Sequence, residues 1–315
     1  MHEMYDEVAW ARRLKVRHLN TFLTLSDSST LTDAAARMHM TQSAMSHWLS
    51  ELESLTGVSL VTRGKRMQLT PAGHAVKRLA VRVLGDISRT HEEISSIKKG
   101  RTARLHVGSV SSGITHLVPQ SILRFQQGHP KVAVQTAEGP FNTLLDDLEK
   151  RELDVVVGPI DARAFSPRLR QQVLFEDRIV AVSGRKHPLR RHRSPSLSML
   201  TQYPWVMPPH GTLMRSQLDA ALLEHGGAAV VPRVETASLF ALQTLLAATD
   251  YIGICSEAVS RHIQALGLLH VIPLVADIPF APIGTVWRED KDDEITRAFL
   301  NALRGVVREQ MEAPE

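Results

Sequence analysis

Residues 19–57 read LNTFLTLSDSSTLTDAAARMHMTQSAMSHWLSELESLTG. The stretch opens on an apolar stripe at helical spacing, formed by Leu19, Phe22 and Leu25. Thr32 is placed to cap a short helix over 33–38, whose alanines allow close packing by a second helix. A polar turn follows, and Thr41 begins another helix that runs to about Leu55. Two helices joined by a turn of about four residues predict a helix-turn-helix.

The second of these helices has one polar face and one largely apolar face when it is drawn at about 100° per residue. The polar face holds Gln42, Ser43, Ser46, His47 and Ser50, and the apolar face holds Met45, Trp48, Leu52 and Leu55. A recognition helix needs short polar side chains near its N-terminus, where glutamine can pair with adenine edges and serine with bases or phosphates. An ordinary solvent-facing helix more usually carries glutamate and lysine. We therefore expect base contacts from Gln42, Ser43, Ser46 and His47, with Thr30 and Thr32 positioning the first helix.

A basic segment follows the helix-turn-helix. Two stretches of alternating apolar residues, 60–62 and 67–69, flank Arg63-Gly64-Lys65-Arg66. This pattern predicts a small hairpin with a basic tip, a wing whose Arg63, Lys65 and Arg66 lie along phosphates. Thr70-Pro71 then opens a long helix, with proline in its first turn, and Thr70 is included among the expected DNA contacts.

The long helix carries an apolar heptad seam. Its positions, spaced alternately by four and three, are Val76, Ala80, Val83, Ile87, Thr90, Ile94 and Ile97. Such a seam is typical of a helix that pairs with a second copy of the chain. The alternative is an amphipathic helix that lies on its own domain.

Length and composition exclude several classes of protein. The chain has 315 residues and 35.0 kDa, which favours two domains, and its 43% hydrophobic and 22% charged residues are typical of globular proteins. No apolar run approaches the roughly 20 residues of a membrane span, and the first ten residues show no secretory signal. The single cysteine excludes an internal disulfide and fits a reducing cytoplasm. We expect a cytoplasmic protein with no membrane partner.

The net charge of +4 is unevenly distributed. Residues 1–100 hold 14 Lys+Arg against 10 Asp+Glu, whereas residues 101–315 hold 23 of each. No acidic residue lies between Glu53 and Asp86, although six basic residues do. A one-signed segment beside a neutral remainder suggests a polyanion-binding module, and the open alternative is a solvated helix face.

Apolar β-rich runs alternate with helical stretches from Arg104 onwards, which predicts an α/β architecture with mostly parallel sheets. The expected strands are 105–110, 132–137, 154–158, 179–182, 230–235, 251–255 and 283–287. The expected helices are 112–127, 142–151, 212–225, 238–248, 256–266 and 292–309.

A family resemblance rests on the N-terminal motif. The residues that carry it are Leu19, Phe22, Ala34-Ala35, Thr41-Gln42-Ser43, Ser46, Leu52-Glu53, Gly57, Leu60, Arg63 and Leu69-Thr70-Pro71-Ala72-Gly73. This pattern resembles the winged helix-turn-helix of LysR-type transcriptional regulators. Ser29, Val61 and Trp48 depart from the family pattern, and Trp48 lies on the flank of the recognition helix.

The resemblance covers nearly the whole chain and implies its organisation. It implies an all-α winged helix-turn-helix over 17–75 and a linker and dimerisation helix over 73–99. It also implies an α/β effector domain over 104–315 that is like a periplasmic binding protein (type 2). The two α/β subdomains of that domain are expected at 104–172 with 274–315, and at 173–273, joined by two crossing strands.

The resemblance also implies an effector cleft between the two subdomains. The residues expected to line it are Ser111, Ser112, Pro140, Phe141, His210, Gly211, Thr212, Leu213, Thr236 and Ser238. They fall where strands lead into helices, and helix N-termini favour anions and polar oxygens. Each serine or threonine could equally be an ordinary helix cap. The family resemblance implies an organic or aromatic acid, or a sugar such as galactose, as the effector.

Enzymatic readings find no support in the motifs. The sequence has no G-x-G-x-x-G, G-x-x-x-x-G-K-[ST] or G-x-S-x-G pattern. Its fifteen histidines show no H-x-x-x-H spacing, and one cysteine makes no zinc cluster. We interpret Cys255 as a buried small hydrophobe, and we expect no metal and no cofactor.

The sequence as a whole therefore predicts a transcription regulator that is not an enzyme. Its expected partners are a near-palindromic double-stranded DNA site, a small-molecule effector and further copies of itself, as a homodimer through the linker helix or a homotetramer. RNA polymerase is a further partner that the family implies. The alternatives are a constitutive DNA-binding protein with a structural C-terminal half, and a solute-binding protein or enzyme with an incidental basic N-terminus.

Overall fold

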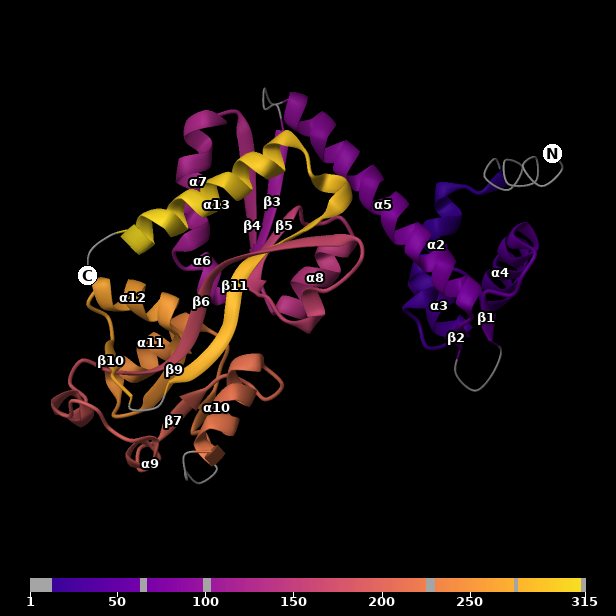
Figure 1. Ribbon diagram of the computed structural model, residues 1–315. Coiled ribbons are helices and arrows are strands. Elements are labelled where there is room, and N and C mark those ends of the chain that lie inside the picture. Colours follow the sequence, from indigo (N-terminus) through magenta and orange to yellow (C-terminus); the bar gives the residue numbers. More distant parts are fainter. Residues whose placement is uncertain (1–12, 63–66, 99–102, 225–229, 275–276, 313–315) are drawn as a thin grey trace. The chain divides into compact units, whose positions relative to one another are not determined.

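The computed structural model describes residues 13–62, 67–98, 103–224, 230–274 and 277–312 (Figure 1). The chain divides into two compact units. One comprises Met1–Thr102 together with Glu149–Glu152, and the other comprises Ala103–Leu148 and Leu153–Glu315. In the part of the chain that is described, no helix is long and apolar enough to cross a membrane.

The first unit consists of helices and one small hairpin. Its elements are α2 (Val16–Ser26), α3 (Leu31–Arg37), α4 (Gln42–Thr56), β1 (Val61–Thr62), β2 (Gln68–Leu69) and α5 (Pro71–Lys98). The antiparallel hairpin pairs Val61 with Leu69. Side chains and backbone set the helix ends: Thr41 Oγ1 accepts from the Ala44 N–H at the start of α4, and Gly57 ends that helix at φ +72°.

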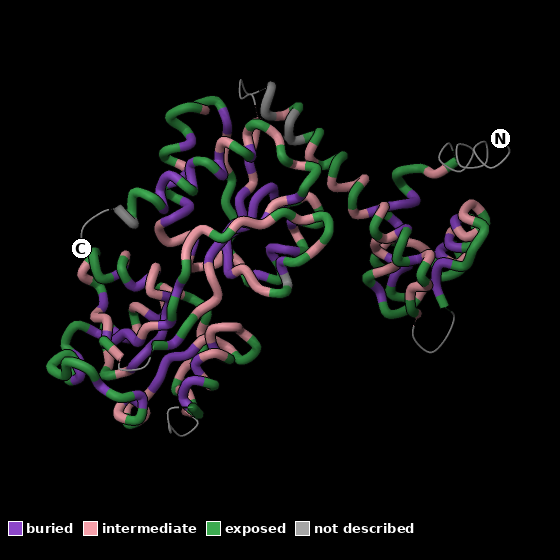
Figure 2. The backbone as a smooth tube through the Cα atoms, in the orientation of Figure 1, coloured by how far each residue is buried: buried purple, intermediate pink, exposed green. Residues whose placement is uncertain are grey.

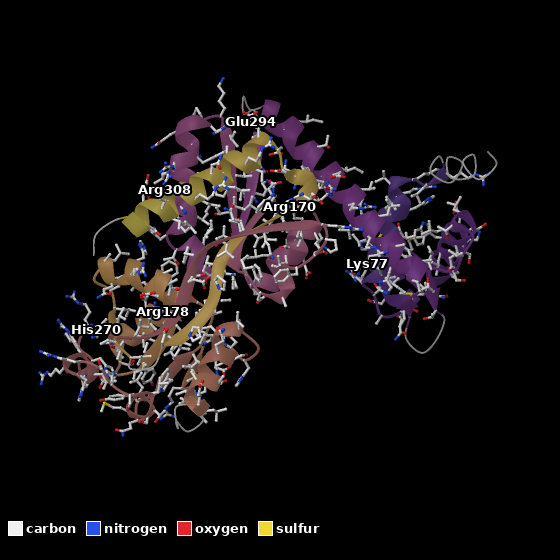
Figure 3. All side chains as sticks on the ribbon, in the orientation of Figure 1. Lys77, Arg170, Arg178, His270, Glu294 and Arg308 are labelled. Carbon is white, nitrogen blue, oxygen red and sulfur yellow. The ribbon has the colours of Figure 1, made fainter. Side chains whose placement is uncertain are left out.

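The core of this unit lies between α2, α3, α4 and the start of α5. Its buried members are Phe22, Leu25, Ala34, Ala35, Met45, Leu49, Leu52, Leu60, Val61 and Val76. Gly73 allows α5 to approach the hairpin, because a Cβ there would lie 2.1 Å from the Leu60 carbonyl oxygen. Outside the core, Lys77 on α5, which is labelled in Figure 3, pairs with Asp27 after α2, with Nζ and Oδ1 2.7 Å apart.

Two details differ from the sequence-based expectation. The residue that caps α3 is Thr30 and not Thr32, because the Thr30 hydroxyl accepts from the Asp33 N–H at 3.1 Å and the helix already begins at Leu31. On α4, Leu49 joins the buried stripe, whereas Trp48 is only partly buried. A stripe at 45, 49 and 52 follows the three-four spacing of a helix that packs on one side.

The heptad seam of α5 has two different environments along its length (Figure 2). Val76 and Ala80 are buried within the first unit, where α2 packs against α5. Further along, Ile87 and Ile94 are 45% and 49% exposed. The first half of the helix therefore lies on its own domain, and the second half presents apolar side chains to solvent in the single chain.

The second unit is built on one nine-stranded sheet with the order β4-β3-β5-β11-β6-β9-β7-β8, and β10 also pairs with β6. Its strands are β3 (Ala103–Ser109), β4 (Val132–Glu138), β5 (Val155–Pro159), β6 (Leu169–Ser183), β7 (Trp205–Met207), β8 (Val234–Glu235), β9 (Ile252–Ser256), β10 (His270–Ile272) and β11 (Ile278–Arg288). β3 runs parallel to β4 and β5, and β7 to β8 and β9. The long strands β6 and β11 are antiparallel to each other and join the two parallel groups.

Helices cover the sheet in two lobes. Lobe 1 holds α6 (Ser111–Ile114), α7 (Leu117–Gly128), α8 (Phe141–Glu149) and α13 (Glu294–Glu312) around β3, β4 and β5. Lobe 2 holds α9 (Leu197–Leu200), α10 (Leu213–Glu224), α11 (Leu239–Ala248) and α12 (Glu257–Ala265) around β7 to β10. Three short 3₁₀ turns, η1 (Ala162–Ala164), η2 (Pro188–Arg191) and η3 (Glu289–Lys291), complete the unit.

Each lobe has a core on both faces of its strands. On β5, Val155 and Val157 pack with α7 and α13, while Val156 packs with α8. On β9, Ile254 belongs to one core of lobe 2 and Cys255 to the other. Alternate residues of a strand point to opposite faces, so strands covered on both sides are apolar throughout.

The buried imidazole of His187 makes lobe 2 sensitive to acid. Its Nδ1 accepts from the Leu189 N–H at 3.1 Å and its Nε2 lies 3.2 Å from the Asp250 carbonyl oxygen, so the proton belongs on Nε2. Burial lowers the pKa of His187 below 6.5, although Asp250 partly opposes the shift. The unfolded chain then binds more protons than the folded one below about pH 6.5.

We expect the free energy of unfolding to be fully retained above about pH 6.5 and to fall as the pH drops from there towards the lowered pKa. Urea unfolding at pH 7.5 and 5.5 measures the loss. His187→Asn removes the titrating group. The free energy of unfolding should therefore differ less between the two pH values in this variant than in the wild type. If the free energy of unfolding of the variant fell as much between these pH values as that of the wild type, this account would be contradicted.

Candidate functional site

The exposed face of α4 collects the polar residues expected to contact bases. Gln42, Ser43 and His47 are exposed and Ser46 is partly exposed, while the opposite side of the helix packs into the core. The hydroxyl of Thr41 also lies 3.0 Å from that of Ser43. The helix N-terminus thus presents an amide, hydroxyls and an imidazole, all groups that can hydrogen-bond to base edges.

The turn between α3 and α4 fixes how these helices lie together. The Met40 N–H donates to the Ala35 carbonyl at 2.8 Å, and His39 adopts a left-handed φ of +54°. Thr30 is engaged as the cap of α3, and Thr32 is exposed in the first turn of that helix. Both threonines therefore lie at the start of α3, with Thr30 before the helix and Thr32 inside its first turn.

The wing is tied to both long helices. The Glu53 carboxylate of α4 accepts from the Leu60 N–H at 2.7 Å. The Thr70 hydroxyl donates to the Ser59 carbonyl at 2.8 Å and accepts from the Gly73 N–H at 3.0 Å, so it caps α5. The tip residues Arg63, Lys65 and Arg66 lie outside the described residues.

A cavity of about 360 Å³ lies in the second unit, with walls from both lobes. The residues that line it are Val110, Ser111, Ser112, Glu138, Gly139, Pro140, Phe141, Asn142, Pro159, Val206, Met207, Pro208, Gly211, Thr212, Leu213, Met214, Thr236, Ala237, Ser238, Leu239, Leu242, Ile254, Cys255, Ser256, Val259 and Phe280. Its volume is within the range of small-molecule sites. The residues expected from the sequence to bind an effector all line this cavity, except His210.

His210 lies elsewhere. Its Nε2 is 3.5 Å from a carboxylate oxygen of Glu235 and 3.3 Å from the guanidinium of Arg215. The buried Arg215 side chain also pairs with Asp219. Gly211, at φ +83°, turns the chain between His210 and the residues that line the cavity.

Several polar groups of the cavity already have partners. The Ser111 hydroxyl donates to Glu138 Oε1 at 2.6 Å. Ser238 accepts from the Ala241 N–H at the start of α11, and Thr212 accepts from the Arg215 N–H at the start of α10. The Ser112 hydroxyl oxygen, in contrast, is buried and has no partner among the described residues.

The sequence did not single out Glu138, Met207, Ile254 or Phe280 as cavity residues. Glu138 is the last residue of β4, and side chains at strand ends commonly enter clefts in α/β folds, so its position was a usable signal. Phe280 lies inside the long strand β11, which pairs with β6, so no strand end marks it as a cavity residue.

Cys255 also lines the cavity and is buried. Burial, with a smaller effect from Asp177, raises the pKa of its thiol well above the ordinary range. A thiol in this state is a poor nucleophile. Among the described residues, no group of three or more histidine, cysteine, aspartate or glutamate side chains could hold a metal ion.

Two family models match the chain, and together they cover most of it. Residues 16–74 match "Bacterial regulatory helix-turn-helix protein, lysR family", and residues 98–308 match "LysR substrate binding domain". The transcriptional regulator GalR of Pseudomonas putida is 28% identical over 94% of this chain and 75% of its own length. The Escherichia coli regulator YdcI is 27% identical over 94% of this chain and 96% of its own.

Solved structures share the fold. The transcriptional regulator CbnR, solved with its target DNA, has a TM-score of 0.61 and 19% identity over 93% of this chain and 99% of its own. A full-length OxyR variant from Pseudomonas aeruginosa has a TM-score of 0.60 and 22% identity over 94% and 95% of the two chains.

Proposed function

Because the chain belongs to the LysR family of transcriptional regulators, we propose that its α4 face reads an operator and that a small molecule in the cavity of the second unit controls this binding. The observation that carries the proposal is that one chain combines a helix-turn-helix with an exposed uncharged polar helix face and a separate unit with a cavity of ligand size. The relatives are transcriptional regulators, and we propose that this protein likewise acts by binding and not by catalysis.

The DNA contacts divide by role. Gln42, Ser43, Ser46 and His47 enter the major groove and carry base selectivity. Thr30 and Thr32 position α3 on the DNA backbone. Thr70, at the base of the wing, lies beside the DNA backbone as well. The phosphate contacts come from the basic tip, Arg63, Lys65 and Arg66, and they strengthen binding at every sequence.

Gln42→Ala should relax selectivity. With duplexes enriched from a random library, the ratio of affinities for the enriched and scrambled sites should fall about tenfold or more, because a glutamine pair with adenine is lost. Fluorescence anisotropy at fixed salt measures both affinities. Ser54→Ala, an exposed change in the last turn of the same helix, is the matched control.

Arg63→Ala gives the complementary result. It should weaken binding to both duplexes alike. The slope of log affinity against log salt concentration should become shallower by an amount that corresponds to about one phosphate contact. An equal loss of selectivity in the Gln42 and Arg63 variants would contradict the division of roles.

The assembly we propose follows from α5. Residues 17–75 form the DNA-binding domain, 73–99 the linker and dimerisation helix, and 104–315 the effector domain. Two linker helices pair and present two DNA-binding domains to a near-palindromic site. Two such dimers form a tetramer. Effector binding between the subdomains (104–172 with 274–315, and 173–273) alters the spacing of the DNA-binding domains. This change in turn alters the access of RNA polymerase to the DNA. The protein works in the cytoplasm, where its DNA lies.

A constitutive DNA-binding protein with a purely structural C-terminal half is the alternative. The cavity argues against it, because close-packed interiors contain few voids larger than a water molecule and this one is lined by residues of both lobes. A thermal-shift screen distinguishes the two: the proposed regulator is stabilised by a bound small molecule, and the constitutive protein is not.

A further inference from the structure

The cavity contains a negative charge and no positive one among its described lining residues. Glu138 and Cys255 are the titratable side chains in that lining, and no lysine, arginine or histidine belongs to it. The buried thiol is neutral at physiological pH. An organic anion entering this space would therefore meet a carboxylate without a side-chain cation to offset it, and like charges at close range repel.

A hydrogen bond holds the carboxylate of Glu138 beside the start of α6. Its Oε1 accepts from the hydroxyl of Ser111, the first residue of α6, at 2.6 Å. The register of β3 and β4 places Glu138 beside Ser109, just before that helix. A carboxylate is thereby held at the edge of the cavity, and Glu138 itself is exposed.

Three other helix starts at the cavity, those of α10, α11 and α12, are capped by side chains. Thr212, Ser238 and Ser256 each accept a backbone N–H from the first turn of α10, α11 and α12. A ligand carboxylate would have to compete with these hydroxyls for the N–H groups. Such competition removes part of the attraction that the helix ends offer an anion.

Two features remain for a ligand to satisfy. Glu138 has a further oxygen that can accept a hydrogen bond, and the buried Ser112 hydroxyl has no partner among the described residues. Much of the remaining wall is apolar, with Phe141, Met207 and Phe280 among its large side chains. A cavity of about 150 Å³ holds benzene, so about 360 Å³ accommodates one substituted ring.

We propose that the effector of this protein is an uncharged or cationic small molecule with one apolar ring, whose hydroxyl or amino group donates to Glu138 and bonds to Ser112. Glu138 is then the residue that selects against organic anions. The inference rests on the proposed function, since it names the class of molecule that the cavity takes.

The test uses sets of compounds that differ in one group. One set is 4-hydroxybenzyl alcohol, 4-hydroxybenzylamine and 4-hydroxybenzoate, and a second is benzyl alcohol, benzylamine and benzoate. The rise in the unfolding midpoint of the full chain is measured against the concentration of each compound. We expect the alcohol or amine member of at least one set to act at a concentration about tenfold or more below its carboxylate.

Glu138→Gln should change the order of the concentrations at which the alcohol, the amine and the carboxylate raise the unfolding midpoint. Without the negative charge, the carboxylate member should act at a concentration closer to that of the alcohol, and the amine should lose its advantage. Asp146→Asn is the matched control, because it removes a charge from an exposed position of α8 that does not line the cavity. The control should keep the wild-type order.

The proposal is overturned if the carboxylates stabilise the wild-type protein at the same or lower concentrations than their partners. It is also overturned if no uncharged or cationic member of either set stabilises it. Selection of duplexes from a random library, done without any compound, tests the regulator function separately. A protein that selects a DNA site but prefers carboxylates refutes only this inference, and one that selects no site refutes the proposed function.

Discussion

Phe22→Ala should unfold the first unit and abolish selective DNA binding while the second unit stays folded. Phe22 is fully buried among α2, α3 and α4, and truncating a buried phenylalanine costs about 3–5 kcal/mol. Small domains are stable by about 5–15 kcal/mol, and one of this size lies near the lower end. The loss is therefore comparable with the whole stability of the domain. Because the chain divides into two compact units, the effector unit should keep its own transition.

Circular dichroism melting and anisotropy on the enriched duplex measure the two effects together. Phe22→Leu is the matched control, because it keeps an apolar side chain in the site and should cost less than the alanine variant. A variant with Phe22→Ala that still bound the duplex with wild-type selectivity would show that the core around α4 does not position the recognition face.

Ile87→Asp combined with Ile94→Asp should separate the two chains that we propose pair through α5. Both isoleucines are about half exposed on the second half of α5, and both belong to the heptad seam that continues beyond the first unit. Paired carboxylates in such a seam would be desolvated beside like charges. Because two linked DNA-binding domains bind far more tightly than one, the affinity for a duplex with two half-sites should fall by about 100-fold or more.

Analytical ultracentrifugation and anisotropy measure the mass and the affinity. The matched control is Ser88→Asp combined with Ser95→Asp, which adds the same charges one residue further along, off the seam. An unchanged mass in the isoleucine variant would show that the seam is not the interface.

Local signals predicted the helix starts well. Thr41 and Thr70-Pro71 were identified as starts, and α4 and α5 begin directly after Thr41 and at Pro71. Capping depends on hydrogen bonds between near neighbours, so a short stretch of sequence contains the information. Thr30 and Thr32 show its limit, because both are good caps and only the packing of the helix selects one.

Long-range pairing explains what the sequence did not reveal. The expected strand 179–182 is the end of β6, which begins at Leu169 and pairs with β11 over most of its length. Its first part is half-buried, so it lacks the apolar run of a core strand. The short strands β7 and β10 were also missed, because three residues carry little periodicity.

The candidate site shows the same division. The rule that sites lie where strands lead into helices identified the loops around the cavity. It could not show that His210 pairs with Glu235 instead, because the turn at Gly211 decides which way the chain faces. The charge of the cavity was also missed, although the place of Glu138 at the end of β4 was a usable signal.

Selection of duplexes from a random library by the wild-type full chain, at about 0.15 M salt, tests the central claim most directly. The account predicts that the recovered sequences share a partly two-fold symmetric motif, with half-sites one or more helical turns of about 10.5 base pairs apart. A recovered pool with no common motif, bound no more tightly than the starting library, would contradict it.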